Sequence, residues 1–339
     1  MESDAVPLYV VGLTYNLKKG IISEVEDLEA EYDDIGTVNA IKKAIEETGC
    51  KVELIGADAD IFNKLQNVQP DIVFNIAEGL HGRGREAQVP AILTHYGIPF
   101  TGSDETTLCL ALDKALAKRL LASYKIKTPK YRLVDKADAT SIRNLSFPII
   151  VKPNAEGSSK GISEMAIVEN REELKRQVKA EYKMYGQPLL VEEFIRGREF
   201  TVGIIGNGTK TTVLPPMEIV YNDKNLKNKI YSFNVKKDYK KHITYVCPPK
   251  LDNKIMDEII RISRKIYEVL QCKDFSRIDF RLNENGEVFF IEINPLPGLA
   301  PNYSDYPMLA EFCSIGYGEL IKMILNSALI RYGMKPVSV

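Results

Sequence analysis

Short apolar segments alternate with helix-like segments through the first hundred residues of the chain. Three apolar runs predict buried strands, at residues 7–13, 51–55 and 71–76. One face of a predicted helix carries Val38, Ile41, Ala44 and Ile45, and Gly49 follows as a plausible stop signal. Residues 17–35 are polar and acidic without clear periodicity, which predicts a long loop or a weak helix. Strands that alternate with helices up to about residue 102 predict a small parallel α/β unit.

The pattern changes after residue 130, where apolar strands follow one another more closely. Strands are predicted at 147–152, 162–168, 188–194, 199–205, 210–214, 274–282 and 287–293. Helices are predicted at about 113–124, 170–183 and 252–270. Two short turns, Gly206-Asn207-Gly208 and residues 283–286, join neighbouring strands as in hairpins. The back part of the chain is therefore predicted to be antiparallel α+β.

Composition and charge narrow the classes of function. A chain of 339 residues is too long for one ordinary core and predicts two or three packed lobes. The formal net charge of -1 gives no basic excess for nucleic acid. No apolar run approaches the ~20 residues of a membrane helix, and the acidic start does not fit a secretory signal. The 5 scattered cysteines form no CxxC pair, so we expect a cytoplasmic enzyme with reduced thiols.

Acidic and amide side chains end two neighbouring strands near the C-terminus. Asp279 lies in the first strand, and Glu292 and Asn294 end the second. Residues two apart on a strand point to the same face, and a hairpin partner can place Asp279 on that face too. Two carboxylates and an amide oxygen suit Mg²⁺ bound to nucleotide phosphates. The alternative is a solvated strand face with ordinary acids, and in either case Ile291 and Ile293 are expected to face a core.

A second candidate site is the strand that ends near Lys152 and the loop of small residues that follows it. Gly157 and Gly161 in that loop let backbone N–H groups approach an anion closely. The lysine precedes the glycines, so the segment is not a Walker A loop. A polar turn with a surface lysine is the alternative interpretation.

Two further segments end in polar side chains that suit ligand binding. Glu192 and Glu193 end an apolar strand and can hydrogen-bond an adenine amino group and ribose hydroxyls, although a solvated strand end is the alternative. His81 and the turn Gly82-Arg83-Gly84 lead into a helix predicted at about 86–96, whose N-terminus favours an anion. The spacing does not match a dinucleotide fingerprint, and a tight turn with an exposed histidine is the alternative.

Together and in this order, the segments resemble the D-alanine–D-alanine ligase family of the ATP-grasp superfamily over roughly residues 71 to 330. The shared motifs are His81-Gly-Arg-Gly, Pro99-Phe-Thr-Gly-Ser103, Asp113-Lys114, Val151-Lys-Pro through Gly161, Glu192 through Glu199, Arg277-Ile-Asp279 and Glu292-x-Asn294-x-x-Pro297-Gly298. The resemblance implies an α/β N-terminal lobe plus an α+β ATP-grasp fold, with ATP between two antiparallel sheets. The three lobes are expected at residues 1–103, 104–188 and 189–339.

The resemblance also implies roles for individual residues. Mg²⁺, or Mn²⁺ in its place, would bind Asp279, Glu292 and Asn294. ATP would contact Lys114, Lys152, Glu192, Phe194, Ile195, Glu199, Lys236 and Ser159. Ser158 would lie on a loop that closes over the reacting centre, Arg277 and the Gly298 backbone would bind the developing oxyanion, and His81 would orient the carboxylate. The loop at Ser158 and the segment 222–245 are the expected lids.

The implied activity is cytoplasmic ligation of two small amino acids through an acyl phosphate, by a homodimer that involves neither nucleic acid nor membrane. The chain departs from the family at two places. Val11–Asn16 stand where the family has a glycine-rich start with a glutamate, and the place of an active-site tyrosine falls near Lys237. Three hypotheses remain: a D-alanine–D-alanine ligase serving the cell wall, a ligase for another amino acid or natural-product precursor, and a nucleotide-binding module without turnover.

Overall fold

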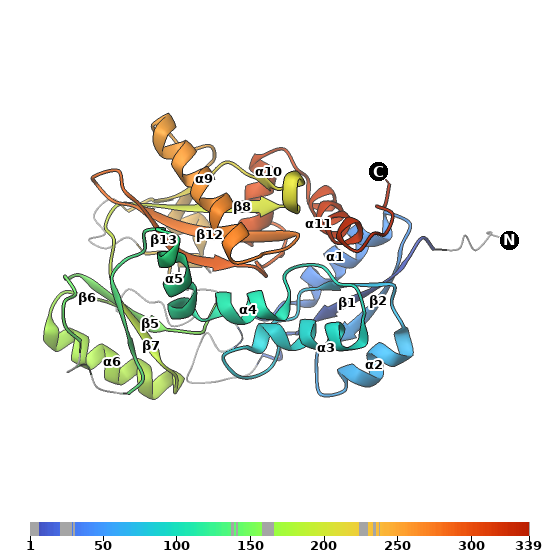
Figure 1. Ribbon diagram of the computed structural model, residues 1–339, viewed down its shortest axis with the longest axis horizontal. Helices are drawn as coiled ribbons and strands as arrows, with labels where there is room; N and C mark the ends of the chain where they lie inside the picture. The colour runs from blue at the N-terminus through green and yellow to red at the C-terminus, as the bar shows by residue number, and fades with distance from the viewer. Residues whose placement is uncertain are drawn as a thin grey trace.

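The computed structural model describes residues 7–20, 29, 31–136, 139, 142–157, 166–223, 230–232, 235–236 and 238–338. In Figure 1 a small sheet lies near both ends of the chain, and two further sheets lie on the side away from the termini. The predicted site residues Ser158 and Ser159, together with Lys237, fall outside the described ranges. Within those ranges, no helix is long and apolar enough to cross a membrane.

The N-terminal sheet is parallel, with the strand order β2-β1-β3. It contains β1 (Val10–Tyr15), β2 (Lys51–Gly56) and β3 (Ile72–Asn75), which alternate with α1 (Ile35–Glu46) and α2 (Ile61–Val68) and are followed by η1 (Arg85–Ala87) and α3 (Gln88–Tyr96). The Asp34 side chain accepts a hydrogen bond from the Thr37 amide and caps α1. The predicted apolar face of α1 is buried. The prediction of a parallel α/β unit is confirmed.

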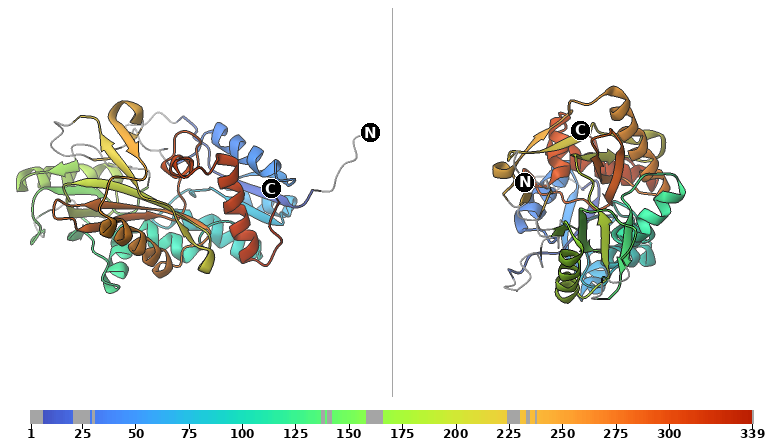
Figure 2. Two further views of the ribbon diagram at one scale, coloured as in Figure 1. Left: turned by 90° about the horizontal axis from the view of Figure 1, so that it is seen from above. Right: turned by 90° about the vertical axis from the view of Figure 1, so that its left-hand side faces the viewer.

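The C-terminal helix α11 (Tyr317–Arg331) packs against α1, so both ends of the chain share one core. Leu320 and Ile324 of α11 lie in the same buried cluster as Val11 and Ile41. Figure 2 shows α11 beside the N-terminal lobe. The preceding helix α10 (Asp305–Phe312) lies between this core and the largest sheet. The last part of the chain therefore ties the N-terminal lobe to the lobe of the largest sheet.

The central sheet is antiparallel and has the order β4-β7-β5-β6. Its strands are β4 (Tyr131–Val134), β5 (Ile149–Pro153), β6 (Ile167–Val168) and β7 (Leu189–Glu193). The helix α6 (Arg171–Tyr185) begins at the Asn170 cap and buries Leu174 and Val178 against the sheet. The predicted lobe boundary at residue 188 falls immediately before β7, so it divides strands that are paired in one sheet.

The largest sheet is also antiparallel, with the order β11-β10-β8-β12-β13 and β9 attached to β8. Its strands are β8 (Arg198–Ile205), β9 (Thr212–Val213), β10 (Met217–Tyr221), β11 (Ile243–Val246), β12 (Phe275–Leu282) and β13 (Val288–Asn294). The helices α4 (Glu105–Leu112), α5 (Lys114–Ser123) and α9 (Asn253–Val269) contribute apolar residues to its core. Both predicted hairpins are confirmed, because β8 pairs with β9 and β12 pairs with β13.

A bulge interrupts the hairpin of β12 and β13 beside Asp279. Asp279 pairs with Glu292, but the next residue of β12, Phe280, pairs with Phe290, so Ile291 is an extra residue. Phe290 and Ile293 are buried, whereas Ile291 lines a cleft. The prediction that Ile291 faces a core is therefore wrong, because the bulge breaks the alternation of the strand.

Candidate active site

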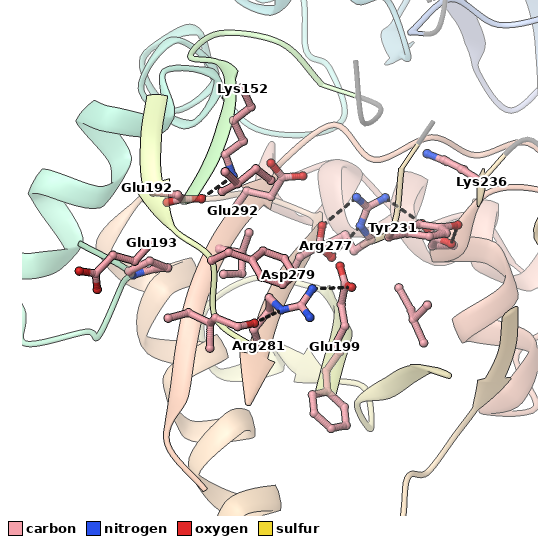
Figure 3. Close-up of a pocket in the computed structure, with 18 residues that line it drawn as sticks. Lys152, Glu192, Glu193, Glu199, Tyr231, Lys236, Arg277, Asp279, Arg281 and Glu292 are labelled. Atoms are coloured by element: carbon pink, nitrogen blue, oxygen red, sulfur yellow. Dashed lines mark hydrogen bonds and ion pairs between the residues drawn. The ribbon is translucent and has the colours of Figure 1, made fainter. Parts of the chain in front are cut away.

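A cleft lies between the central sheet and the largest sheet. Side chains of β5 and β7 form one wall, and side chains of β8, β12 and β13 form the other. Figure 3 shows charged groups from both sheets gathered around this cleft. The predicted site residues that line it are Lys152, Glu192, Phe194, Ile195, Glu199, Lys236, Arg277, Asp279 and Glu292.

Two buried lysines share one carboxylate in the wall of the cleft. Lys152 Nζ lies 2.7 Å from Glu192 Oε1, and Lys118 Nζ lies 3.0 Å from Glu192 Oε2. Lys118 also donates to Thr128 Oγ1 at 2.8 Å. Burial alone would raise the pKa of Glu192, but the two lysine charges lower it below its ordinary value. Glu192 is therefore an ionised carboxylate that fixes the position of Lys152.

The predicted metal ligands meet where the middle of β12 pairs with the C-terminal end of β13. Asp279 lies opposite Glu292, and Asn294 Nδ2 donates to Asp279 Oδ2 at 3.4 Å. Glu292 Oε2 lies 3.6 Å from Lys114 Nζ. Burial alone would raise the pKa of Glu292, but the neighbouring lysine and arginine charges lower it to about 2. Burial raises the pKa of Asp279, and Arg277 opposes this only in part.

Arg277 is held between two carboxylates at one end of the cleft. Its Nη2 lies 2.9 Å from Asp279 Oδ2, and its Nη1 lies 3.5 Å from Asp305 Oδ2. Asp305 Oδ1 accepts hydrogen bonds from the hydroxyls of Tyr231 and Tyr245, at 2.9 and 2.7 Å. A guanidinium that is anchored on two sides keeps one orientation, and its planar fork suits a carboxylate or a phosphate.

The other end of the cleft combines a flat apolar surface with hydrogen-bond acceptors. The Arg281 guanidinium lies 4.5 Å from the centroid of the Phe194 ring, and Arg281 Nε donates to the Ile195 carbonyl at 2.6 Å. Arg281 Nη1 lies 2.9 Å from Glu199 Oε2, which also accepts from the Tyr221 hydroxyl at 2.7 Å. Burial raises the pKa of Glu199, although Arg281 opposes it. Such a surface suits a nucleobase with its ribose.

A second cavity of about 540 Å³ adjoins the cleft at Arg277 and Lys236, which line both spaces. The N-terminal lobe contributes several charged residues to its wall: Lys18, Glu31, Asp33, Asp34, Glu78 and Glu86. The loop after β13 forms another part of the wall and includes Gly298, where a Cβ would lie only 2.8 Å from Ser304 Oγ. Burial lowers the pKa of Lys236, although Asp305 opposes it.

The structure does not bring every predicted site residue to these two spaces. Lys114 lies beside Glu292 in a smaller adjoining cavity, which Asn294 lines as well as the second cavity. The side chain of His81 is exposed and lines none of these three cavities, and its carbonyl accepts a hydrogen bond from Gln88 Nε2 at 2.7 Å. Among the described residues, His81 makes no hydrogen bond or ion pair with another predicted site residue.

Sequence reasoning missed several residues that hold the site together. Lys118 follows Lys114 by one helical turn on α5, so helical spacing could have paired the two lysines. Arg281 follows Asp279 by two residues on β12, so strand alternation could have placed it in the cleft. Asp305 gave no comparable signal, because it reaches Arg277 from a helix that begins after the strand pair has ended.

Known proteins share both the sequence pattern and the fold. Residues 120–326 match the family described as the D-ala D-ala ligase C-terminus. The chain is 36% identical over 292 residues to the D-alanine–D-alanine ligase of Aquifex aeolicus, covering 86% of this chain and 94% of that protein. It is 32% identical over 302 residues to an uncharacterised protein of Sinorhizobium fredii, covering 87% and 88%.

A solved structure extends the comparison to the fold. The D-alanine–D-alanine ligase of Bacillus anthracis complexed with ATP has a TM-score of 0.73, with 22% sequence identity, and the match covers 96% of this chain and 98% of that one. The predicted fold, an α/β lobe with an ATP-grasp arrangement of two antiparallel sheets, is confirmed.

Proposed function

Because the chain belongs to the D-alanine–D-alanine ligase family, we propose that it activates the carboxylate of D-alanine or a similar amino acid as an acyl phosphate. The protein is an ATP-dependent ligase that joins two amino acids through a peptide bond and releases ADP. The observation that carries the proposed chemistry is the gathering of Lys114, Lys152 and Arg277 around Glu292. Three cations beside one ionised carboxylate form a polyanion site with a place for a counter-ion.

The nucleotide is proposed to lie in the cleft between the two antiparallel sheets. Adenine packs on Phe194 beside the Ile195 backbone, and Glu199 accepts from the ribose hydroxyls. Lys152, fixed by Glu192, then reaches the phosphates together with Lys114. Support for this orientation comes from the apolar and acceptor character of one end of the cleft and the cationic character of the other.

Asp279, Glu292 and Asn294 fit a divalent metal ion in the chemistry of their donor atoms. Two carboxylates and an amide oxygen form the hard, all-oxygen set that Mg²⁺ and Mn²⁺ prefer. The low pKa of Glu292 keeps that ligand ionised. When bound there, Mg²⁺ would neutralise charge on the nucleotide phosphates.

The remaining residues act on the carboxylate that is activated. A carboxylate is a poor acyl donor, and phosphorylation converts its oxygen into a leaving group. Arg277, which the two aspartates hold in place, and the backbone amide of Gly298 would bind the oxyanion, at roughly 3 kcal/mol of transition-state stabilisation per donor. An acyl phosphate hydrolyses in water, so the site has to exclude solvent before it forms. Ser158 and Ser159 are proposed to help exclude solvent when the site closes, and His81 is proposed to orient the carboxylate.

Turnover with matched variants tests this proposal. Protein, ATP and Mg²⁺ are incubated with D-alanine and with other D- and L-amino acids, while ADP release and product mass are followed. Glu292→Gln should abolish dipeptide formation, whereas Glu284→Gln, in the exposed turn of the same hairpin, should retain it. Full activity in Glu292→Gln, or no ATP cleavage with any amino acid, would contradict the proposed site.

The same reaction on an amino acid other than D-alanine is a second candidate function. The observation in its favour is the acidic wall of the second cavity, which carries Glu31, Asp33, Asp34, Glu78 and Glu86. An alanine methyl group offers no partner for that charge. Product mass in the experiment above separates the two candidates, because each amino acid pair gives a different dipeptide.

The organisation of the working enzyme is proposed as three lobes in a homodimer. A second boundary between β7 and β8, rather than at residue 188, keeps the central sheet whole. The homodimer rests on the family resemblance and is tested by sedimentation. A cytoplasmic location is supported by the 5 cysteines, all of which are free thiols in the structure.

A further inference from the structure

Two carboxylates of the second cavity make no ion pair in the described part of the chain, although the charge of Arg85 reaches both of them and that of Lys114 reaches Glu86. Glu78 follows β3, and Glu86 lies in η1. Neither side chain makes a hydrogen bond or an ion pair with any residue that the structure describes. Glu86 is only 8% exposed, yet it lines the cavity. An ionised carboxylate at such a position is costly unless a cation or a donor reaches it.

Two other acids of the same wall, Glu31 and Asp34, already have partners. Glu31 Oε1 accepts from Arg85 Nη2 at 2.5 Å and from the Gly157 amide at 2.6 Å. Asp34 caps α1 through the Thr37 amide. The acids of the wall whose side chains make no hydrogen bond or ion pair with a described residue are therefore Glu78, Glu86 and, next to Lys18, Asp33.

Asp33 makes no ion pair with a described residue, but it lies near the charge of Lys18, so it differs both from the paired acids and from Glu78 and Glu86. Burial raises the pKa of Asp33 to about 7, although the nearby charge of Lys18 opposes this shift. Lys18 therefore offsets part of the charge at the rim of the cavity next to Asp33.

The electrostatics of Glu78 and Glu86 agree with a missing cation. Burial and the neighbouring Glu31 raise the pKa of Glu86 to about 8, and the charges of Arg85 and Lys114 oppose this only in part. Burial and the neighbouring Glu86 raise the pKa of Glu78. A ligand with positive groups would offset this repulsion, and the two carboxylates would then be ionised together.

The arrangement favours an organic cation over a metal ion. Among the residues that the structure describes, no three acidic, histidine or cysteine side chains lie close enough to hold one metal ion. Arg277 and Lys236 line the same cavity and suit a carboxylate. A volume of about 540 Å³ lies within the roughly 300–1,000 Å³ of small-molecule sites, so it can take side chains larger than a methyl group.

We infer that one of the two amino acids joined by this protein is a diamino acid, whose two ammonium groups face Glu78 and Glu86 and whose carboxylate faces Arg277 and Lys236. This inference rests on the proposed function and names the substrate class of its second cavity. To offset both carboxylates, the bound amino acid needs a positive charge at its α-amino group and a second one on its side chain. A substrate with only the α-amino group leaves one buried carboxylate without a partner.

Matched substrates test the inference. ATP cleavage and product mass are measured with D-alanine as one partner and with diaminopropionate, diaminobutyrate, ornithine or lysine as the other, in both enantiomers. Each diamino acid is compared with its uncharged isostere. We expect kcat/KM for at least one diamino acid to exceed that of its isostere by about tenfold or more, because the isostere leaves a buried polar group unpaired.

Variants then connect this preference with the two carboxylates. Glu86→Gln and Glu78→Gln should each reduce the ratio of diamino acid to isostere toward one, while Glu46→Gln, on the exposed side of α1, should keep it. Thermal melting of each variant shows whether it is folded, and Glu78→Gln supplies the test if Glu86→Gln does not fold. An unchanged ratio in a folded Glu78→Gln or Glu86→Gln variant would overturn the inference.

The outcomes separate the inference from the proposed function. Ligation of D-alanine pairs without preference for any diamino acid would overturn the inference and leave the proposed function standing. ATP cleavage with no amino acid pair, together with protection from heat by a diamino acid that depends on Glu86, would overturn the proposed function and keep the cavity assignment. Protection by Mg²⁺ alone that is lost in Glu86→Gln would assign the carboxylates to a metal and overturn the inference.

Discussion

Glu192→Gln should lower the free energy of unfolding more than almost any other conservative substitution, because it removes the carboxylate shared by two buried lysines. Lys118 and Lys152 lie 3.0 and 2.7 Å from that carboxylate, and their side chains are at most 3% exposed. Removing one partner from a buried ion pair costs about 3–5 kcal/mol. In a chain of 339 residues we expect Tm to fall by roughly 4–7 °C.

A double-mutant cycle isolates the interaction. Lys118→Met, Glu192→Gln and the double variant are compared by calorimetry, and the coupling energy between Lys118 and Glu192 should be about 2 kcal/mol or more. Burial already lowers the pKa of Lys118 to about 8, and loss of the carboxylate lowers it further. The defect of Glu192→Gln should therefore be smaller at about pH 9 than at about pH 7, because Lys118 then releases its proton.

An exposed ion pair provides the control for this experiment. Glu172 lies 2.9 Å from Lys175 on the outside of α6, and Glu172→Gln should leave Tm unchanged within error. A loss below about 1 kcal/mol for Glu192→Gln would refute the reasoning, since it would mean that other groups neutralise the two lysines.

Three further changes test separate parts of the structure. Arg281→Lys should raise KM for ATP about tenfold with little change in kcat, as measured by steady-state kinetics, because an ammonium cannot replace the fork that contacts Glu199. The pKa of Glu86 is raised from 4.5 to about 8, so its stabilising contribution is complete below about pH 4.5 and is lost as the pH rises through 8. Glu86→Gln should then match the wild-type protein in thermal melts at about pH 5 and exceed it by a few kcal/mol at about pH 9, and equal stability at both would contradict the assignment. Gly197→Ala should destabilise by about 3 kcal/mol or more in denaturant titrations, because Gly197 has a φ of +135° and its Cβ would meet the Leu282 carbonyl oxygen.

The sequence predicted much of the arrangement that local periodicity controls. The parallel N-terminal unit, both hairpins and the helix α9 follow from apolar spacing and turn residues. Strand alternation also predicted that Asp279, Glu292 and Asn294 would share a face, and the structure places them together. Short-range rules succeed here because a hairpin leaves few choices of register.

Contacts between distant segments could not be predicted in this way. The bulge at Ile291 depends on how β12 meets β13, and no local signal marks it. Glu78 and Glu86 come from the N-terminal lobe, whereas Arg277 comes from β12, so their shared cavity appears only when the lobes are packed together. The pairing of Lys118 with Glu192 likewise joins a helix of one segment to a strand of another.

Binding of Mn²⁺ together with a non-hydrolysable ATP analogue, followed by electron paramagnetic resonance, tests the central claim most directly. The proposed ion lies between Asp279, in the middle of β12, and Glu292 and Asn294, at the end of β13, beside Lys114 and Lys152. Wild-type protein and Glu284→Gln should bind the ion and the nucleotide together, and Glu292→Gln should lose at least about tenfold in affinity for the ion. Equal affinity in Glu292→Gln and wild-type protein would contradict the assignment of the metal and of the phosphates beside it.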